Sequence, residues 1–189
     1  QMNLSQAHAA PGGSPELRNR EIVTFNYDGP NFDAIGLTGG GSFSVASRFP
    51  ASMTAPYTGY DFKSVQVYIN DIPSNATLKI WATGTTTTPG PLLVEQVFTP
   101  TADSWITIEL TQPFANDGTD IWVGYSVTHG ADQFPAGTDI GPANPNGDWI
   151  SLDGVEWAHL AGFGLNYNWN IRLQLEGTGG GQFNWLTLN

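Results

Sequence analysis

Two stretches in the second half of the sequence alternate strictly between apolar and polar residues, and they constrain the fold most. They are residues 120–128 and 166–175. The apolar side chains on one face are Ile121, Val123, Tyr125 and Val127 in the first, and Tyr167, Trp169, Ile171, Leu173 and Leu175 in the second. A period of two with one apolar face is typical of a half-buried antiparallel strand. Between them, residues 134–149 are rich in Gly, Pro, Asn and Asp. The sequence therefore predicts two strands that hold a long loop, where β proteins commonly carry function.

The rest of the chain repeats this alternation in shorter runs. Further strands are predicted at residues 21–27, 42–49, 61–70, 76–83, 92–98 and 105–110, and a short hairpin at 149–152 and 155–160. The hairpin is centred on Asp153-Gly154, a dipeptide that favours two-residue turns. No helix of three turns is expected, and consecutive strands without crossover helices pair antiparallel. The pattern of about eight to ten strands predicts an all-β fold, an antiparallel two-sheet sandwich of jelly-roll-like form.

The sandwich is predicted to span residues 21–176. Residues 1–20 are polar and are interrupted by Pro11 and Pro15, so they are interpreted as an N-terminal tail or linker. Residues 177–181 are four glycines and a threonine, and this composition predicts a flexible spacer. Residues 182–189 form a short apolar segment that contains Trp185, and they are interpreted as the start of a following module.

The charge balance narrows the class of partner. Six Lys and Arg stand against 17 Asp and Glu, which gives a net charge of −11. Binding to nucleic acid or to an anionic membrane surface needs clustered cations, so neither is expected. No apolar run of about 18 residues is present, so no membrane insertion is expected either. The chain has no cysteine, which rules out disulfides and thiolate chemistry. The charge balance is compatible with binding to neutral glycans, cations or basic partners.

No motif indicates catalysis. The sequence lacks a Gly-x-Ser-x-Gly elbow, a His-Glu-x-x-His pair and a phosphate-binding Gly-x-x-x-x-Gly-Lys loop. The histidines His8, His129 and His159 are expected to be exposed loop residues rather than members of a catalytic triad. The many acids allow a pair of carboxylates for a glycosidase without indicating one. The chain is therefore not expected to be an enzyme, and a hydrolase is the most remote alternative.

A structural calcium ion is the one cofactor that the sequence leaves open. Four aspartates lie in the Gly-, Pro- and Asn-rich region: Asp132, Asp139, Asp148 and Asp153. Calcium prefers carboxylate, amide and carbonyl oxygens, so Asp139, Asp148 and Asp153 are candidate metal ligands. The alternative is that these side chains form turns by accepting hydrogen bonds from their own backbone. Asp28 and Asp33 form a second, weaker candidate. Zinc is not expected, because cysteine is absent and no histidine pair has ligand spacing.

Aromatic residues supply the candidate ligand site. They make up 12% of the chain and include seven Trp. Trp149 and Trp157 flank the predicted hairpin turn, and they are predicted to be exposed side chains on which a ligand stacks. Asn168, Asn170 and Arg172 form the polar face of the last strand and would bind hydroxyl groups. Together these five residues are the predicted ligand site.

Three other tryptophans are assigned by their place in the alternation. Trp169 shares a face with Ile171 and Leu173, so it is predicted to lie in the core. Trp81 and Trp122 fall on the opposite face from the apolar residues of their strands. They form either a binding platform or a second packing layer under a loop, and the sequence leaves both readings open.

Several short motifs follow one another in a characteristic order. They are Phe25-Asn-Tyr-Asp-Gly29, Ser47-Arg-Phe49, Leu78-Lys-Ile-Trp81, Pro89-Gly-Pro-Leu-Leu93, Asp120-Ile-Trp-Val-Gly-Tyr125, Phe134-Pro-Ala-Gly137, Gly147-Asp-Trp-Ile-Ser151 and Asn168-Trp-Asn-Ile-Arg172. In this order the chain resembles the β-sandwich modules of secreted, surface-displayed bacterial proteins, related broadly to cleaved adhesin and haemagglutinin modules. The resemblance covers residues 21–176 and implies an exported, non-catalytic accessory or adhesion module of jelly-roll type. The Asp-rich calcium turn of the adhesin modules is not matched, since only Asp28 remains of it. Residues 183–188 resemble the opening strand of an immunoglobulin-like repeat.

These observations predict an extracellular or cell-surface module of a larger protein that acts in adhesion or glycan binding. Its expected partners are a glycan or a surface protein, together with neighbouring domains of a longer chain. The alternative is a structural spacer with no ligand of its own. The two functions differ in whether Trp149, Trp157 and the loop acids are exposed on one surface.

Overall fold

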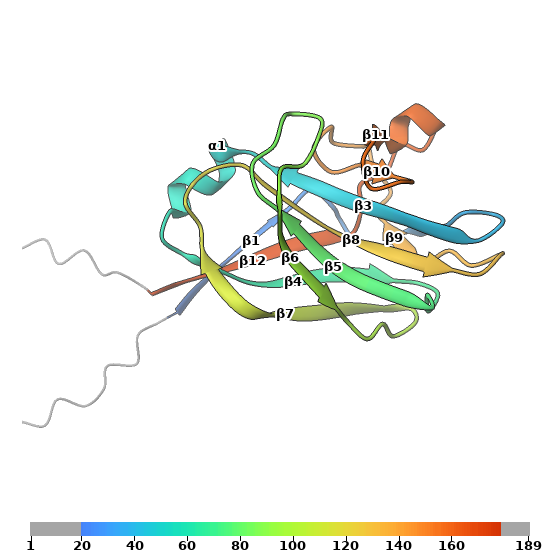
Figure 1. Ribbon diagram of the computed structural model, residues 1–189, viewed down its shortest axis with the longest axis horizontal. Helices are drawn as coiled ribbons and strands as arrows, with labels where there is room; N and C mark the ends of the chain where they lie inside the picture. Colours follow the sequence, from blue (N-terminus) through green and yellow to red (C-terminus); the bar gives the residue numbers. More distant parts are fainter. Residues whose placement is uncertain (1–19, 179–189) are drawn as a thin grey trace, which may run out of the picture.

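The computed structural model describes residues 20–178, which form a β sandwich (Figure 1). The predicted tail before residue 20 and the predicted segment after residue 178, with Trp185, lie outside the described residues. The strands are β1 (Arg20–Asn26), β2 (Asp33–Ile35), β3 (Gly41–Phe49), β4 (Asp61–Ile69), β5 (Asn75–Trp81), β6 (Leu92–Val97), β7 (Ser104–Ala115), β8 (Ile121–His129), β9 (Ala136–Thr138), β10 (Trp149–Ser151), β11 (Ala158–His159) and β12 (Ile171–Thr178). The helical segments are α1 (Ala51–Thr54), η1 (Ala55–Tyr57) and η2 (Leu160–Phe163). Within this part of the chain, no helix is long and apolar enough to cross a membrane.

The strands form two six-stranded sheets. Sheet A has the order β1-β12-β4-β9-β2, with β7 also paired to β4, and sheet B has the order β11-β10-β3-β8-β5-β6. Every strand pair is antiparallel. The predicted all-β, antiparallel two-sheet sandwich is therefore confirmed.

The strand order also explains the jelly-roll form. Eight strands, taken in chain order, are β1, β3, β4, β5, β6, β7, β8 and β12. The first pairs with the last, the second with the seventh, the third with the sixth and the fourth with the fifth. A chain folded as one long double-stranded ribbon and then rolled across two sheets gives this nested pairing, which is the jelly-roll arrangement.

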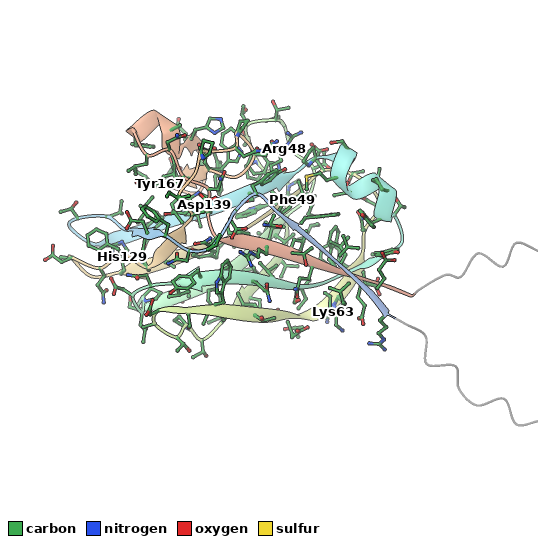
Figure 2. The ribbon with its side chains drawn as sticks, turned by 180° about the vertical axis from the view of Figure 1, so that it is seen from behind. Arg48, Phe49, Lys63, His129, Asp139 and Tyr167 are labelled. Carbon is green, nitrogen blue, oxygen red and sulfur yellow. The ribbon has the colours of Figure 1, made fainter. Side chains whose placement is uncertain are left out.

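The core lies between the two sheets and comes from alternate residues of their strands. In sheet B it includes Phe43, Val45 and Phe49 of β3, Leu78 and Ile80 of β5, and Val123, Tyr125 and Val127 of β8. In sheet A it includes Phe25 of β1, Val65, Val67 and Ile69 of β4, and Ile171, Leu173 and Leu175 of β12. Trp169 is fully buried among them, as predicted. Figure 2 shows the sandwich from behind, with Phe49 and His129 at opposite ends of the paired strands β3 and β8.

The last predicted strand differs in its bounds. The alternation from residue 166 predicted a strand as far as 175, but β12 begins at Ile171 and continues to Thr178. Residues 166–170 instead contact loops, because their polar side chains bond to loop groups; Trp169 makes one isolated bridge to Thr138. β12 thus continues two residues past the predicted end of the sandwich at 176, and β1 begins at Arg20, one residue before the predicted start at 21.

Two short strands were not predicted. β2 and β9 have three residues each and pair with one another, and Ile69 of β4 joins them to sheet A through Ala136. Runs this short show no alternation.

His129 was predicted to be exposed, but it is buried. Its Nδ1 lies 2.8 Å from the carbonyl oxygen of Gly130, and its Nε2 accepts the N–H of Leu37 at 3.1 Å, so the ring fixes the loop before β3.

Tyr27 makes stability sensitive to alkaline pH. Tyr27 is the first residue after β1, and its ring stacks on that of Phe49 with the centroids 5.4 Å apart. Its hydroxyl donates a hydrogen bond to the carbonyl oxygen of Arg48 at 2.8 Å. Burial raises the pKa of Tyr27 to about 12, and burial also raises the pKa of Tyr125. An unfolded tyrosine ionises near pH ~10, so the folded state binds the phenolic proton more tightly. This contribution to stability is complete below pH ~10 and is lost as the pH rises toward ~12.

We therefore expect the melting temperature to fall between pH ~10 and pH ~12, and to fall less steeply in Tyr27→Phe. The variant keeps the ring and loses one hydrogen bond, which costs about 1 kcal/mol at neutral pH. Circular dichroism melts across this pH range measure both effects. The melting temperature of the variant should still fall somewhat with pH, because burial also raises the pKa of Tyr125. Parallel pH profiles for the two proteins would contradict the assignment.

Candidate functional site

The outer face of sheet B, away from the core, is divided into two regions. Successive side chains of a strand point to opposite faces, so residues two apart share a face. Lys79 and Trp81 of β5 therefore lie on the same outer face, as do Ser151 and Trp149 of β10. The tryptophans gather at one end of this face, and small polar side chains occupy the other.

The tryptophan end is a packed cluster formed by Trp81, Trp122, Trp149 and Trp157 around Ala46. Ring centroids lie 5.3 Å apart for Trp122 and Trp149, 6.1 Å for Trp122 and Trp157, and 5.5 Å for Trp81 and Trp157. Trp122 is fully buried, so of the two readings left open for this residue the structure shows a second packing layer.

Trp149 is only 3% exposed, which contradicts its predicted role as an exposed stacking surface. The physical reason is that β10 lies inside the sheet, paired with β3 on one side and with β11 on the other. The chain then returns over the face, where Trp157 packs on Trp122. On the paired strand β11, the His159 ring lies with its centroid 3.8 Å from that of Trp149, at an angle of 38°. Trp157 itself is half-buried.

Gly124 lets β3 and β8 approach each other beside this cluster. It pairs with Ala46, and a Cβ atom at position 124 would lie 1.8 Å from the carbonyl oxygen of Val45 and 2.8 Å from Cα of Ala46. A side chain at this position would therefore collide with backbone atoms of β3.

The hairpin that follows β10 is fixed by Asp153. Its Oδ1 accepts the backbone N–H groups of Val155 and Glu156, each at 2.8 Å, and the hydroxyl of Ser151 at 3.2 Å. The two backbone hydrogen bonds hold the pKa of this exposed carboxyl below its usual range. Asp153 thus acts as a turn former.

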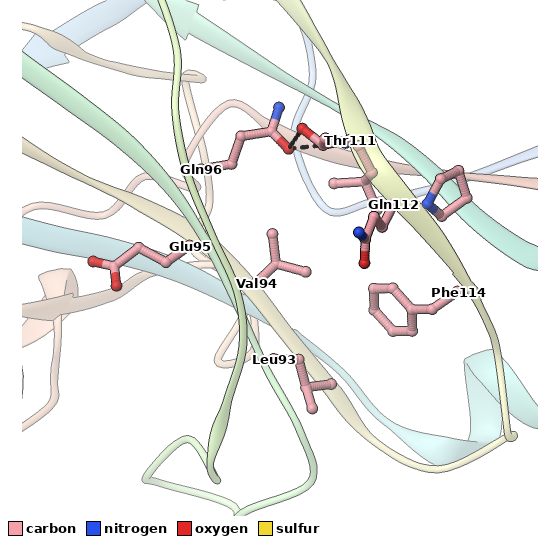
Figure 3. A pocket seen from close by; sticks show the side chains of 9 residues that line it. Leu93, Val94, Glu95, Gln96, Thr111, Gln112 and Phe114 are labelled. Carbon is pink, nitrogen blue, oxygen red and sulfur yellow. Dashed lines mark hydrogen bonds between the residues drawn. The ribbon is translucent and has the colours of Figure 1, made fainter.

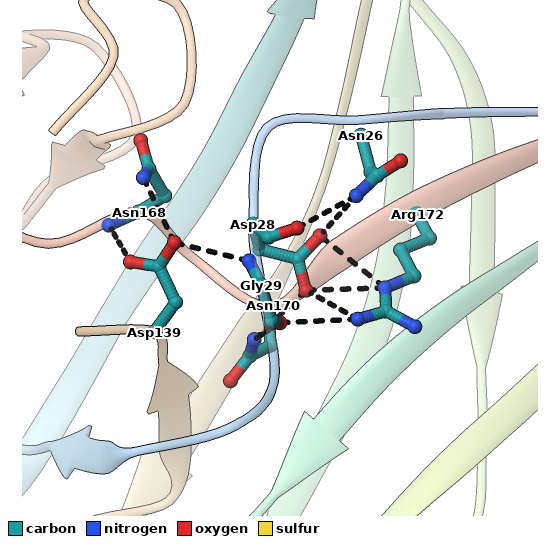
Figure 4. A network of polar contacts seen from close by, with 7 residues as sticks. All are labelled: Asn26, Asp28, Gly29, Asp139, Asn168, Asn170 and Arg172. Carbon is teal, nitrogen blue, oxygen red and sulfur yellow. Dashed lines mark hydrogen bonds and ion pairs between the residues drawn. The ribbon is translucent and has the colours of Figure 1, made fainter. Parts of the chain in front are cut away.

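Asp148 and Asp139 are buried, and each has its own partners. Asp148 accepts a hydrogen bond from the Nδ1 atom of His159 at 2.6 Å. Asp139 accepts the N–H groups of Gly29, Gly141 and Asn168, at 3.1, 2.8 and 2.8 Å. The side-chain amide of Asn168 adds a bond at 3.0 Å (Figure 4).

The predicted calcium ligands Asp139, Asp148 and Asp153 are therefore not brought together. Each carboxylate faces N–H or O–H donors of the protein, and a carboxylate whose lone pairs are already bonded to donors is a poor ligand for a cation. No three acids or histidines in residues 20–178 are placed to hold a metal ion. The second candidate pair for calcium, Asp28 and Asp33, does not form a site either. Asp28 is bonded to Arg172, whereas Asp33 is exposed on β2.

Asp28 is the centre of a second buried network. Its side chain is fully buried and accepts bonds from Asn26 at 3.0 Å, from Asn170 at 2.8 Å, and from Nε of Arg172 at 3.1 Å (Figure 4). Arg172 also places its guanidinium 4.0 Å from the ring centre of Trp105. This network ties the turn after β1 to the start of β12.

Asn168, Asn170 and Arg172 were predicted to form the polar face of the last strand and to belong to one ligand site with Trp149 and Trp157. The structure contradicts this arrangement, because Asn168 and Asn170 are buried and serve the two aspartate networks. They also lie next to sheet A, whereas the tryptophans cover sheet B. The five predicted residues therefore do not form one surface.

The polar end of the outer face contains a groove of about 370 Å³ that the sequence did not indicate. Its polar lining includes Ser42, Ser44, Asn75, Thr77, Lys79, Glu95, Ser126, Thr128 and Ser151. The hydroxyls of Ser42 and Thr128 are 2.7 Å apart, and the ammonium of Lys79 lies 3.6 Å from the carboxylate of Glu95. Leu152, Asp153 and Gly154 also line it. We name this site the outer-face groove.

A larger hollow of about 610 Å³ lies at the open side of the sandwich, between β6 and β7 (Figure 3). Gln96 spans the two strands, donating to the carbonyl oxygen of Glu109 at 2.9 Å and accepting the N–H of Thr111 at 3.0 Å. Leu93, Leu110 and Phe114 line much of the remainder. The side-chain amide of Gln96 thus links the edges of the two sheets by hydrogen bonds to the backbone of β7. Its polar atoms are already bonded to the protein.

Comparison with known proteins adds little to this geometry. No protein-family model matches the sequence, and no curated protein matches it significantly. A solved structure of infectious bursal disease virus, Gx strain, is similar to the chain at 14% identity with a TM-score of 0.36. That match covers 93% of this chain and 37% of the viral chain. A likeness at this level carries no argument about function.

Proposed function

We propose that the chain is a non-catalytic, extracellular adhesion module that binds neutral glycans in the outer-face groove. The observation that supports this most is the groove's lining, in which hydroxyl and amide groups from β3, β5, β8 and β10 converge. Each sugar hydroxyl both donates and accepts hydrogen bonds, and serine and threonine hydroxyls do the same. A rigid sheet also holds these groups in place before binding, which lowers the entropic cost.

The charges of the groove favour a neutral sugar. Lys79 is the one cation in the lining, and Glu95 is close enough to neutralise it. Asp153 adds a further negative charge to the lining. An acidic glycan would meet these carboxylates and a chain of net charge −11, whereas a neutral ring meets no repulsion.

Aromatic contact is available at one end of the groove. Trp81 is half-buried and lies two residues beyond Lys79 on the same face of β5. A glycan that extends past Lys79 would therefore reach the edge of the tryptophan cluster. A shallow groove with one such contact supports weak single-site binding, with a dissociation constant of about 0.1–1 mM that repeated modules would strengthen. The order of motifs shared with surface-displayed modules is in line with this use.

The test is to fill the groove. Ser126 is half-buried in the middle of the lining, and Ser126→Tyr places a ring across the floor. We expect binding in a neutral-glycan array, or retention in a polysaccharide gel, to fall by at least about tenfold, which corresponds to about 1.4 kcal/mol. Gln66→Tyr is the matched control, because Gln66 is also half-buried on the outer face of the other sheet.

Both variants are expected to melt within a few degrees of the parent chain. Equal glycan binding by Ser126→Tyr and the parent would remove the groove from the proposal. If the parent chain binds no neutral glycan in a broad screen, the module is better described as a structural spacer.

A further inference from the structure

The segment between β10 and β12 presents large apolar side chains to solvent. Leu152, Val155 and Phe163 are 58%, 72% and 59% exposed, and all three lie in residues 152–163, which we name the knob. Single exposed apolar residues are common, but several on one protrusion are typical of a surface that another molecule covers.

The knob is held rigidly in spite of this exposure. Asp153 fixes its turn, as described above. Leu160 is 1% exposed and donates its N–H to the carbonyl oxygen of Asp148 at 2.9 Å, which anchors the opposite end. Between them, Trp157 packs on Trp122, and His159 is bonded to Asp148. A partner would therefore bind preformed apolar groups and lose little conformational entropy in ordering them.

Phe163 stands between two hollows that can receive side chains of a partner. One, of about 350 Å³, is lined mainly by Ile150, Leu152 and Trp157. The other, of about 570 Å³, is lined in part by Pro145. Phe163 lines both. Binding energy at protein interfaces concentrates on a few large side chains that fill pockets, and Phe163 offers a ring next to two recesses that a partner's side chains can fill.

The charged side chains of the knob and of the residues just before it are all acidic. Residues 147–163 contain Asp148, Asp153 and Glu156 and no Lys or Arg. Asp153 and Glu156 are exposed and line the smaller hollow beside Leu152 and Phe163. A complementary surface therefore carries positive charge next to an apolar side chain. A second copy of the knob would set these acids against each other, which disfavours self-association through this face.

We infer that the knob is a docking surface for another protein, whose binding segment carries an apolar side chain flanked by Lys or Arg. The knob adjoins the outer-face groove, since Leu152, Asp153 and Gly154 line the groove. Val155, Glu156 and Phe163 do not line it, so substitutions at Glu156 and Phe163 test the knob apart from glycan binding. The acids select the partner and the apolar side chains supply most of the contact.

The test selects displayed random peptides on the parent chain and removes those that also bind Phe163→Ser. The surviving peptides should be enriched in Lys or Arg next to Leu, Phe or Trp. A synthetic copy of the most enriched peptide should bind Phe163→Ser and Glu156→Lys at least about tenfold more weakly than the parent. Its affinity for the parent should also fall as salt rises from about 50 to about 500 mM.

Phe32→Ser is the matched control, since Phe32 is 57% exposed, precedes β2 in the chain and lines neither of the two hollows beside Phe163. It should bind the peptide as the parent does. Three results would overturn the inference: no peptide survives the counter-selection, the survivors are acidic, or Phe163→Ser abolishes sedimentation of the chain with phosphatidylcholine vesicles. The last result would identify a membrane surface as the occupant instead. Glu156→Lys tests the charge independently of the apolar contact, because the Glu156 side chain is exposed and it is the backbone N–H that bonds to Asp153.

Discussion

Gly124→Ala is expected to destabilise the chain by about 4 kcal/mol or more, the range of the most damaging single substitutions. The new Cβ atom would lie 1.8 Å from the carbonyl oxygen of Val45. Neither strand can move aside easily, because β3 and β8 are paired from Gly41–His129 to Phe49–Ile121 in the middle of sheet B. The clash therefore separates two central strands or unfolds the sandwich.

Thermal and urea unfolding measure this effect, and a loss of about 4 kcal/mol corresponds to about 8–16 °C for a domain of this size. Gly39→Ala is the control, since a Cβ atom there meets no heavy atom within 4 Å. It should change stability by less than about 0.5 kcal/mol. A Gly124→Ala protein that melts like the parent would show that the β3–β8 spacing is wrong.

Asp28→Ala is the second substitution with a large expected effect, about 3–5 kcal/mol of lost stability. The carboxylate is the shared acceptor of Asn26, Asn170 and Arg172, so its removal leaves a partly buried guanidinium and a buried amide without that partner. Unpaired groups of this kind pay their desolvation cost with nothing to offset it. The turn after β1 should loosen from β12 as a result.

Urea unfolding of Asp28→Ala, compared with Asp61→Ala, separates this network from a general effect of lost charge, because Asp61 is exposed at the start of β4. The double variant Asp28→Ala/Arg172→Met should recover part of the loss, since it removes the unpaired cation as well. Equal stability of the two single variants would contradict a central role for Asp28.

The fold could be predicted because each sheet covers one face of the core and leaves the other outside. Apolar and polar residues therefore alternate along each strand. This alternation is visible in the sequences of β3, β4, β8 and β12 without knowledge of the strands they pair with. Strands of three residues, such as β2 and β9, are too short to show it.

The site could not be predicted in the same way. Alternation correctly placed Trp122 and Trp81 on the face away from the core, but it carries no information about what covers that face. Trp149 was predicted to be exposed for this reason. The rings that cover it belong to other strands, and the sequence does not show that the fold brings them together. Asn168 and Asn170 were misplaced because their acceptors, Asp139 and Asp28, are 29 and 142 residues away. The outer-face groove left no local motif, since single Ser and Thr residues of separate strands build it.

The nested strand order has a mechanical consequence. β1 is an edge strand, and Arg20 at its start pairs with Thr178 at the end of β12, so both described ends leave the sandwich at one point. Tension between these ends pulls β1 away from β12 one residue pair at a time, from Arg20 toward Asn26, rather than shearing the whole ladder at once. The load is met first by these few pairs at the edge of sheet A. Sheet B, with the outer-face groove and the knob, bears no force until β1 has peeled off.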